Sequence, residues 1–230
     1  MCPISRFIIA AIFAFIPALA YGVIVYCPGL EITLETENKS DADILCNTID
    51  TGRTVLSALG LELPARLSIS FSHDPIVNNL CQSKCIGFYD ARYNIIFLPD
   101  YKSLQYKSQQ ASLFINEAVT SIIWESYLIH ELAHAAVQST ILPETSMCIA
   151  CEYIASVAQL EAMPTIERDK ILDYYKDLHG FVGNEEITLT YYLIDSARFI
   201  VNSYLHYHRP ENGPHFIEQI LIDGLSCDLL

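Results

Sequence analysis

Two histidines and a glutamate in the run Tyr127–Ala136 have the types and the spacing that metal chemistry needs. His130 and His134 are four residues apart, and Glu131 directly follows the first of them. Residues four apart on an α-helix lie on one face, one turn above each other, so a single cation can touch both imidazoles. Zinc binds neutral His nitrogens, and a nearby carboxylate can take a proton from a water that the metal activates. The motif therefore predicts two zinc ligands, His130 and His134, and a general base, Glu131.

The flanks of this motif favour a long helix. No Gly or Pro occurs between residues 111 and 142. Asn116 with Glu117 could open the helix, and Pro143 lies beyond its end. Two His and one Glu on such an apolar helix cost free energy when buried unless something pairs with them, and a metal is the simplest partner. The alternative is a pair of ordinary helix histidines that hydrogen-bond to solvent.

A zinc ion that catalyses a reaction needs a third protein ligand and an open position. The metzincin pattern would place a glycine and a third histidine where this chain has Val137 and Thr140, so that class is excluded. A glutamate from the next helix remains, either Glu152 or Glu161. These two are nine positions apart, so on one helix they point about 180° away from each other and only one can face the metal. We favour Glu152, because small or polar residues share its face, and keep Glu161 as the alternative.

The N-terminal twenty residues have the pattern of an export signal. Arg6 supplies a positive start, residues 7–16 are an unbroken apolar run, and Ala18–Ala20 has the small residues of a cleavage site. The apolar run is short for a transmembrane helix. We therefore predict a signal peptide over residues 1–20 and a single exported domain, periplasmic or secreted, over residues 21–230. The alternative is an uncleaved N-terminal anchor.

The charge of the chain limits its partners. Its formal net charge is −14, and the acidic residues are scattered. A negative surface repels nucleic acid and anionic membrane surfaces, so we expect neither as a partner. Beyond residue 20 no apolar run is long enough to span a bilayer, so we expect no stable membrane insertion after signal cleavage.

The cysteines fit an oxidising compartment, where disulfides are the default. Seven of the eight lie beyond residue 20, and Cys27 with Cys46 could staple the N-terminal segment. Two further pairs are close enough to bond locally: Cys81 with Cys85, and Cys148 with Cys151. An odd number leaves one cysteine over, and connectivity does not follow from sequence. A second zinc site made from the two short pairs is the alternative.

Hydrophobic periodicity predicts strands before the motif and helices after it. We expect a helix over residues 40–61, a strand over 65–72, a hairpin over 86–98, and after the motif helices over 146–162, 166–179, 186–208 and 214–225. This order indicates an α+β fold in which a small mixed sheet with a hairpin packs on the motif helix, followed by a helical C-terminal part.

The motif with a downstream glutamate resembles the gluzincin branch of the zincin metallopeptidases, most closely its small secreted bacterial members. The gap from His134 to Glu152 is 18 positions, close to the spacing of that family, and the similar stretch covers residues 65–161. Tyr127 is a departure, because the family more often has Val or Thr there. The resemblance implies a zincin-like fold and hydrolysis of peptide bonds in a peptide or protein substrate. His130, His134 and Glu152 would hold Zn²⁺, and Glu131 would be the base.

For the hydrolysis that the resemblance implies, we also expect a donor that stabilises the oxyanion. Tyr204, His206 and His208 are candidates for the donor, although an amphipathic helix end also explains them. The strand Asn94–Leu98 could pair with an extended substrate, or could be an ordinary core strand. Two other functions remain open: a catalytically inactive zinc-binding interaction module of the cell envelope, and a disulfide-stapled structural protein with a chance motif.

Overall fold

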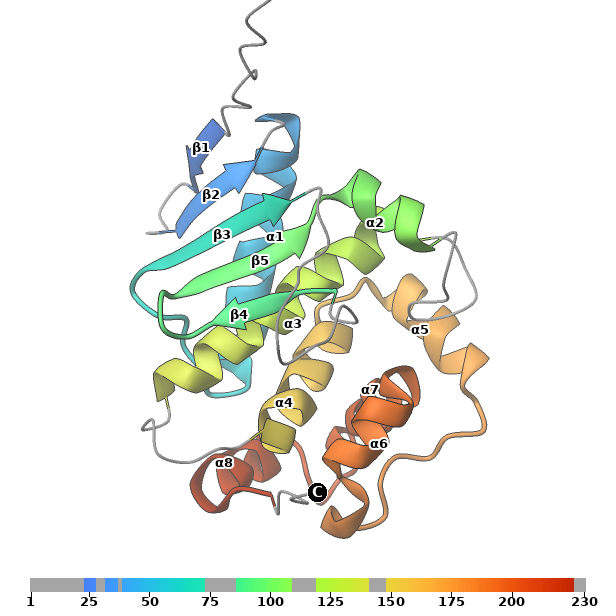
Figure 1. The fold of residues 1–230 in the computed structure, drawn as a ribbon. Helices are drawn as coiled ribbons and strands as arrows, with labels where there is room; N and C mark the ends of the chain where they lie inside the picture. Colours follow the sequence, from blue (N-terminus) through green and yellow to red (C-terminus); the bar gives the residue numbers. More distant parts are fainter. Residues whose placement is uncertain are drawn as a thin grey trace, which may run out of the picture.

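The computed structural model describes residues 23–27, 32–36, 39–72, 86–108, 119–140 and 148–225. The predicted signal peptide lies outside the described residues, as do Cys81, Cys85 and Cys227 and the side chain of Cys148. The described part is an α+β structure, with a five-stranded sheet at one end and most of the C-terminal helices at the other (Figure 1). The coarse fold class predicted from the sequence is therefore confirmed.

The sheet is mixed. Its strands are β1 (Val23–Tyr26), β2 (Ile32–Thr36), β3 (Leu67–Ser72), β4 (Phe88–Asp90) and β5 (Ile95–Pro99). They lie in the order β1-β2-β3-β5-β4, with two parallel pairings inside and an antiparallel pairing at each edge. Strand β3 falls within the predicted range, whereas β1 and β2 were not predicted.

The predicted hairpin is formed by β4 and β5, and Asn94 turns the chain with a φ of 53°. A positive φ is tolerated by Asn better than by most residues, which suits it to this turn. The suggestion that Asn94–Leu98 offers a free edge to a substrate is wrong. Strand β5 is paired with β3 on one side and β4 on the other, so β4 is the edge strand.

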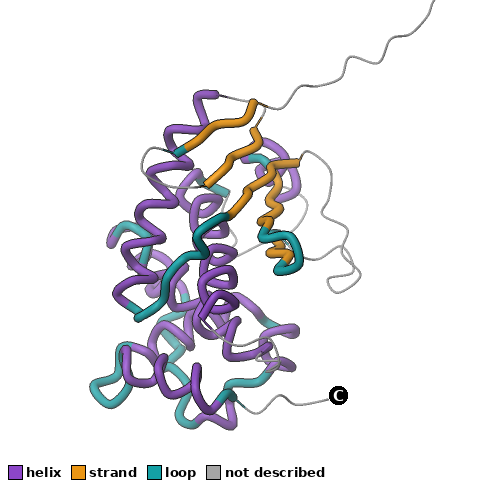
Figure 2. Tube along the Cα trace, turned by 90° about the vertical axis from the view of Figure 1, so that its left-hand side faces the viewer, coloured by secondary structure: helices purple, strands orange, loops and turns teal. Residues whose placement is uncertain are grey.

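Eight α-helices are described: α1 (Lys39–Ala58), α2 (Tyr101–Ser108), α3 (Ser121–Thr140), α4 (Cys148–Glu161), α5 (Thr165–Tyr174), α6 (Leu189–Ile194), α7 (Ser196–Tyr207) and α8 (Pro214–Asp223). A short 3₁₀ turn, η1 (Asn184–Glu186), precedes α6. Figure 2 shows the strands on one side of the molecule and the long helices on the other. Helices α1 and α3 pack on the sheet, and α4 joins α3 to the C-terminal helices. No described helix combines the length and the apolar character needed to cross a membrane.

Helix α3 carries the metal motif through the middle of the molecule. Because α1, α4 and the sheet surround it, its buried residues occur on nearly every face, as expected of a central helix. Its start differs from the prediction at Asn116. Thr120 is not helical, and its hydroxyl accepts a hydrogen bond from the Ile123 backbone N–H at 3.3 Å, so Thr120 caps the helix.

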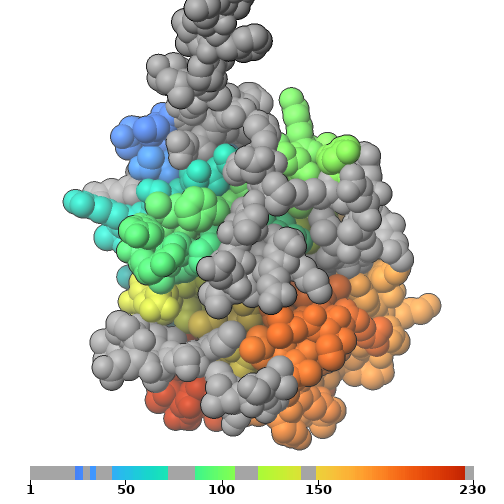
Figure 3. All heavy atoms as spheres, in the orientation of Figure 1, coloured from blue at the N-terminus to red at the C-terminus, as the bar shows by residue number. Residues whose placement is uncertain are grey.

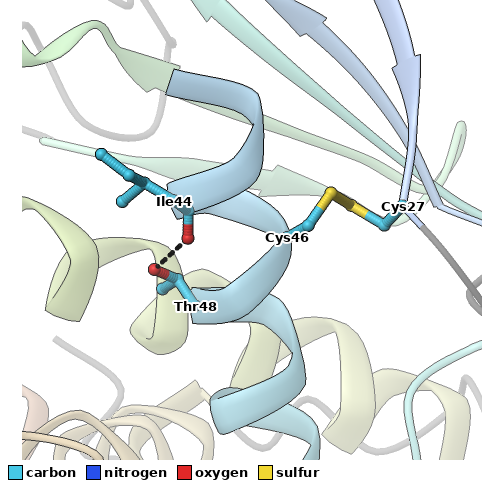
Figure 4. Close-up of a disulfide and its surroundings, with 4 residues drawn as sticks. All are labelled: Cys27, Ile44, Cys46 and Thr48. Carbon is cyan, nitrogen blue, oxygen red and sulfur yellow. Dashed lines mark hydrogen bonds between the residues drawn. A yellow bond between two sulfur atoms is a disulfide. The ribbon is translucent and has the colours of Figure 1, made fainter. Parts of the chain in front are cut away.

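Helix α1 approaches α3 closely and is tied to the sheet. A Cβ on Gly52 would lie 3.0 Å from Leu132 Cδ1, so the absence of a side chain lets the helices meet here. A disulfide joins Cys27, which follows β1, to Cys46 in α1 (Figure 4). This bond confirms the pairing suggested from the sequence, and it stabilises chiefly by limiting the unfolded chain.

The helix predicted over residues 186–208 is in fact two helices with a break at Asp195. The Asp195 side chain accepts a hydrogen bond from the Arg198 backbone N–H at 3.1 Å and so caps α7. Thr188 caps α6 in the same way through the Tyr191 N–H. Both residues prefer N-caps to helix interiors, because their side chains compete for backbone donors. The non-helical backbone of Asp195 therefore ends α6 before α7 begins.

Candidate metal centre

Helices α3 and α4 pack together and bring three potential metal ligands to one point. The His130 and His134 rings lie one helical turn apart, with 4.9 Å between their centroids. Glu152, in the first half of α4, places its Oε2 3.3 Å from His130 Nε2 and 3.7 Å from His134 Nε2. One ligand atom from each of the three residues lies within 4.8 Å of the others. The cluster could hold a metal ion.

The chemistry of this cluster fits a cation. Glu152 Oε2 is buried and has no hydrogen-bond partner among the described residues. A buried carboxylate oxygen without a partner is costly, and a cation between it and the imidazoles would remove that cost. Two neutral imidazoles and one carboxylate are also the ligand set of several zinc enzymes that keep a fourth position open.

The electrostatics of the cluster favour the ligating forms of two side chains. Burial raises the pKa of Glu152, but the His134 and His130 imidazoles outweigh it and lower that pKa to about 2. Burial lowers the pKa of His134 to about 4. Burial also lowers the pKa of His130, but Glu152 more than compensates, and the net direction is upward. Glu152 is thus anionic and His134 neutral at neutral pH, which are the states that bind metals.

Glu131 lies beside the cluster on the sheet side of α3. It is buried, and the Tyr89 backbone N–H of β4 donates a hydrogen bond to it. A Cβ on Gly87 would lie 2.6 Å from Glu131 Oε1, so only glycine leaves room for the carboxylate here. The pKa of Glu131 is raised to about 7, chiefly by burial. The nearby His130 acts to lower this pKa, and the Glu152 charge acts to raise it. The edge strand therefore holds this carboxylate against the cluster.

Tyr192 in α6 is a member of the site that the sequence analysis missed. Burial and then the nearby Glu152 carboxylate raise the pKa of its phenol well above the ordinary value, and Tyr192 in turn helps to lower the pKa of Glu152. The Glu131 charge also acts on this phenol, so the hydroxyl lies near both carboxylates. Two adjacent tyrosines in an apolar run gave no signal, but the capping residues Thr188 and Asp195 could have marked α6 as a separate helix.

The donor candidates named from the sequence lie elsewhere. His206 is buried and its Nδ1 is 2.8 Å from the Tyr153 hydroxyl. His208 interacts with Glu161, and the Tyr204 ring contacts the His208 ring at a tilt of 52°, with 4.4 Å between the ring centroids. None of the three histidine and tyrosine candidates has a described contact with the metal cluster. Glu161, the alternative third ligand, is likewise engaged away from it.

A cavity of about 170 Å³ lies between α1, α3 and the connection from α4 to α5. Its lining includes Glu125 and Ser126 of α3 but none of the three ligands. On the face shown in Figure 3, yellow atoms of α3 and α4 are visible between the strands at one end and the C-terminal helices at the other. The cavity is separate from the cluster, because no ligand lines it.

A family model matches residues 32–229, and the chain belongs to that family, DUF6639, a family of unknown function. No curated protein and no solved structure matches the chain. A functional proposal for this protein rests on its own residues.

Proposed function

We propose that this protein is an exported zinc metallopeptidase that hydrolyses peptide bonds. The observation that carries the proposal is the convergence of His130, His134 and the unpartnered Glu152 oxygen from two helices, with the buried Glu131 carboxylate beside them. A structural zinc site has four protein ligands, whereas three leave a position for water and substrate. A carboxylate next to that position is what hydrolysis requires.

His130, His134 and Glu152 would hold the zinc ion. When bound, the ion would act as a Lewis acid that polarises the peptide carbonyl and lowers the pKa of a water to about 7. Glu131 takes the proton of the attacking water and passes it to the leaving amine. Its position suits this role. The Tyr89 N–H donates a hydrogen bond to the carboxylate, and Gly87 leaves room for it. Glu131 also follows His130 directly, so it lies about 100° around the helix from that ligand and is not aimed at the metal itself.

Tyr192 is the proposed donor to the oxyanion. A phenol can donate a hydrogen bond where negative charge develops, and α6 brings this one to the Glu152 side of the cluster. Strand β4 is the proposed site for an extended substrate. It lies at the edge of the described sheet, and its Tyr89 backbone contacts Glu131. Both assignments replace candidates from the sequence that lie elsewhere.

The test is a screen of peptide libraries with purified protein of measured zinc content. The wild type should contain about one zinc per chain and cleave peptides. Glu131→Gln keeps the shape and removes the basicity, so cleavage should fall by about 100- to 10,000-fold while zinc stays bound. Glu125→Gln is the matched control on the same helix, outside the ligand cluster, and should cleave like the wild type.

Two outcomes would contradict the proposal, one its mechanism and one its activity. Equal cleavage by wild type and Glu131→Gln would remove Glu131 from the mechanism. Zinc in the wild type without cleavage in a broad screen would favour a zinc-binding module that does not catalyse.

A further inference from the structure

The nitrogen of His130 that faces away from the cluster belongs to a buried hydrogen-bond chain. His130 Nδ1 lies 3.0 Å from Gln159 Oε1 in α4. Gln159 Nε2 donates to Ser126 Oγ at 3.1 Å, and Ser126 Oγ donates to the Ile123 backbone carbonyl at 2.7 Å. Gln159 has no exposed surface, and Ser126 is 2% exposed. The chain links two helices behind the metal ligands.

The direction of every hydrogen bond in this chain follows from its last member. The hydroxyl of Ser126 has one proton, and the Ile123 carbonyl accepts it, so Ser126 Oγ can only accept from Gln159. The amide nitrogen of Gln159 must then face Ser126, which leaves its oxygen facing His130. An amide oxygen only accepts, so the proton of a neutral His130 is on Nδ1. The lone pair of Nε2 is thereby directed towards Glu152 and the metal position.

The second histidine has no such support. No hydrogen bond to the His134 ring is found among the described residues, and its side chain is 18% exposed against 9% for His130. The two ligands therefore differ: His130 is oriented before a metal arrives, whereas His134 has a less restricted ring.

The identity of the orienting residue also matters. Burying an amide costs free energy that an apolar side chain of equal size would avoid, so both of its hydrogen bonds must be made. A carboxylate could accept from His130 equally well, but the site already contains the carboxylates Glu131 and Glu152. The neutral amide orients the imidazole without adding a third buried negative charge.

We infer that Gln159 is a positioning residue that fixes His130 as the Nδ1–H tautomer and directs its Nε2 to the metal, and that Ser126 orients Gln159. This inference rests on the metal centre of the proposed function but not on peptide hydrolysis. Outer partners of metal-bound histidines fix the ring and its tautomer, and their loss typically lowers metal affinity about 10- to 100-fold.

The test combines zinc affinity with the tautomer of His130. Zinc affinity is measured by competition with a chromophoric chelator. The tautomer is measured by two-bond ¹H–¹⁵N NMR of the zinc-free protein, at a pH where the ¹⁵N shifts show that the His130 ring is neutral. The wild type should show His130 as a single Nδ1–H form. Gln159→Met should bind zinc about 10- to 100-fold more weakly and lose the single tautomer.

Two variants and a control separate positioning from packing. Gln159→Glu restores an acceptor for His130 and should keep both the tautomer and the zinc affinity, at a cost in stability from the third buried carboxylate. Ser126→Ala should have a smaller effect than Gln159→Met on the tautomer and the zinc affinity. Ser203→Ala removes a buried hydroxyl of α7 that has no hydrogen-bond partner in the described part of the chain, and it should bind zinc like the wild type. Thermal unfolding of each variant shows whether it is folded, and the wild-type tautomer needs no variant at all.

Each result bears on the inference separately from the peptidase. Unchanged zinc affinity in Gln159→Met, or an Nε2–H form of His130 in the wild type, would overturn the positioning role. A wild type that binds no zinc would overturn it together with the metal centre. A wild type that binds zinc with the expected tautomer but cleaves nothing would support the positioning role and sink only the peptidase.

Discussion

Helix α4 carries one glutamate in its first half and one at its end, and each contacts histidine from another part of the chain, but the two surroundings differ. Glu152 lies with His130 and His134 in the interior, where no described residue gives its Oε2 a hydrogen bond. Glu161 lies with His208 at the surface, where the side chains are 25% and 46% exposed, and Arg168 is a second partner at 3.9 Å.

The difference between these two clusters shows which one is built for a ligand. At the surface, opposite charges pair with each other and water covers the rest, so nothing further is needed and the net contribution is about 0–1 kcal/mol. In the interior, two imidazoles and a carboxylate converge, and no described residue donates a hydrogen bond to one carboxylate oxygen. This arrangement costs free energy unless a cation binds. The same residue types thus predict different chemistry once burial and pairing are known.

The largest expected effect comes from replacing each of the two glutamates in turn. Glu152→Ala removes a ligand and should lower zinc affinity by more than about 100-fold, the upper end of the loss for an outer partner. Glu161→Ala leaves the ligands untouched and should keep about one zinc per chain. Elemental analysis after dialysis against a weak chelator measures both. Zinc loss in Glu161→Ala with retention in Glu152→Ala would reverse the comparison.

A second prediction concerns the crowding that distinguishes the interior cluster. Gly87→Ala places a methyl group against the Glu131 carboxylate and must displace it, because the three atoms nearest to that methyl group all belong to Glu131. Cleavage should fall by about 100-fold, as for a misplacement of about 1 Å, with zinc retained. Gly60→Ala is the control: nothing lies within 4 Å of its Cβ position, so it should affect stability but not turnover. Steady-state kinetics on a peptide from the screen gives the comparison.

The interior site was more predictable than its surroundings. Spacing on one helix brought His130 and His134 together without any knowledge of the fold, and helical geometry separated Glu152 from Glu161. Tyr192 was missed because it reaches the cluster only after α6 breaks from α7 at Asp195, which is a matter of tertiary packing.

The sheet shows the same limit. Alternation predicted β3 and the hairpin, but which strand lies at the edge depends on the long-range pairing of β3 with β5. The contact of Gly87 with Glu131 is likewise between segments far apart in the chain. Local patterns thus predicted the ligands, and non-local pairings decided what lies beside them.

A third prediction uses the disulfide, which lies apart from both clusters. It closes a loop with a sequence separation of 19 residues, so its removal in Cys46→Ser should lower the free energy of unfolding by about 3 kcal/mol. Urea denaturation measures the change. Zinc affinity of the folded variant should equal that of the wild type, because α3 and α4 supply every ligand. A folded variant that loses zinc would show that the disulfide positions the metal site.

The smallest expected effect concerns His206, a buried histidine that has a hydrogen-bond partner but no place in the metal cluster. Burial lowers the pKa of His206, with Arg209 acting in the same direction and Glu211 and Glu186 opposing. Above the ordinary imidazole pKa of about 6.5, both the folded and the unfolded protein are neutral at this residue, so His206 adds no pH dependence. Below that pH the unfolded chain takes up a proton first, and the free energy of unfolding falls until the lowered pKa of the folded state is reached.

His206→Gln removes this titration and should flatten the pH dependence below about 6.5. Urea denaturation of the variant and the wild type under the same conditions measures the difference, in which the contribution of the other histidines cancels. Tyr153→Phe deletes the hydroxyl at 2.8 Å from His206 Nδ1 but keeps the ring that buries it, so the slope should persist in this control. Loss of the slope in Tyr153→Phe would show that the hydrogen bond, and not burial, holds His206 neutral. An unchanged slope in His206→Gln would show that some other group destabilises the protein in acid.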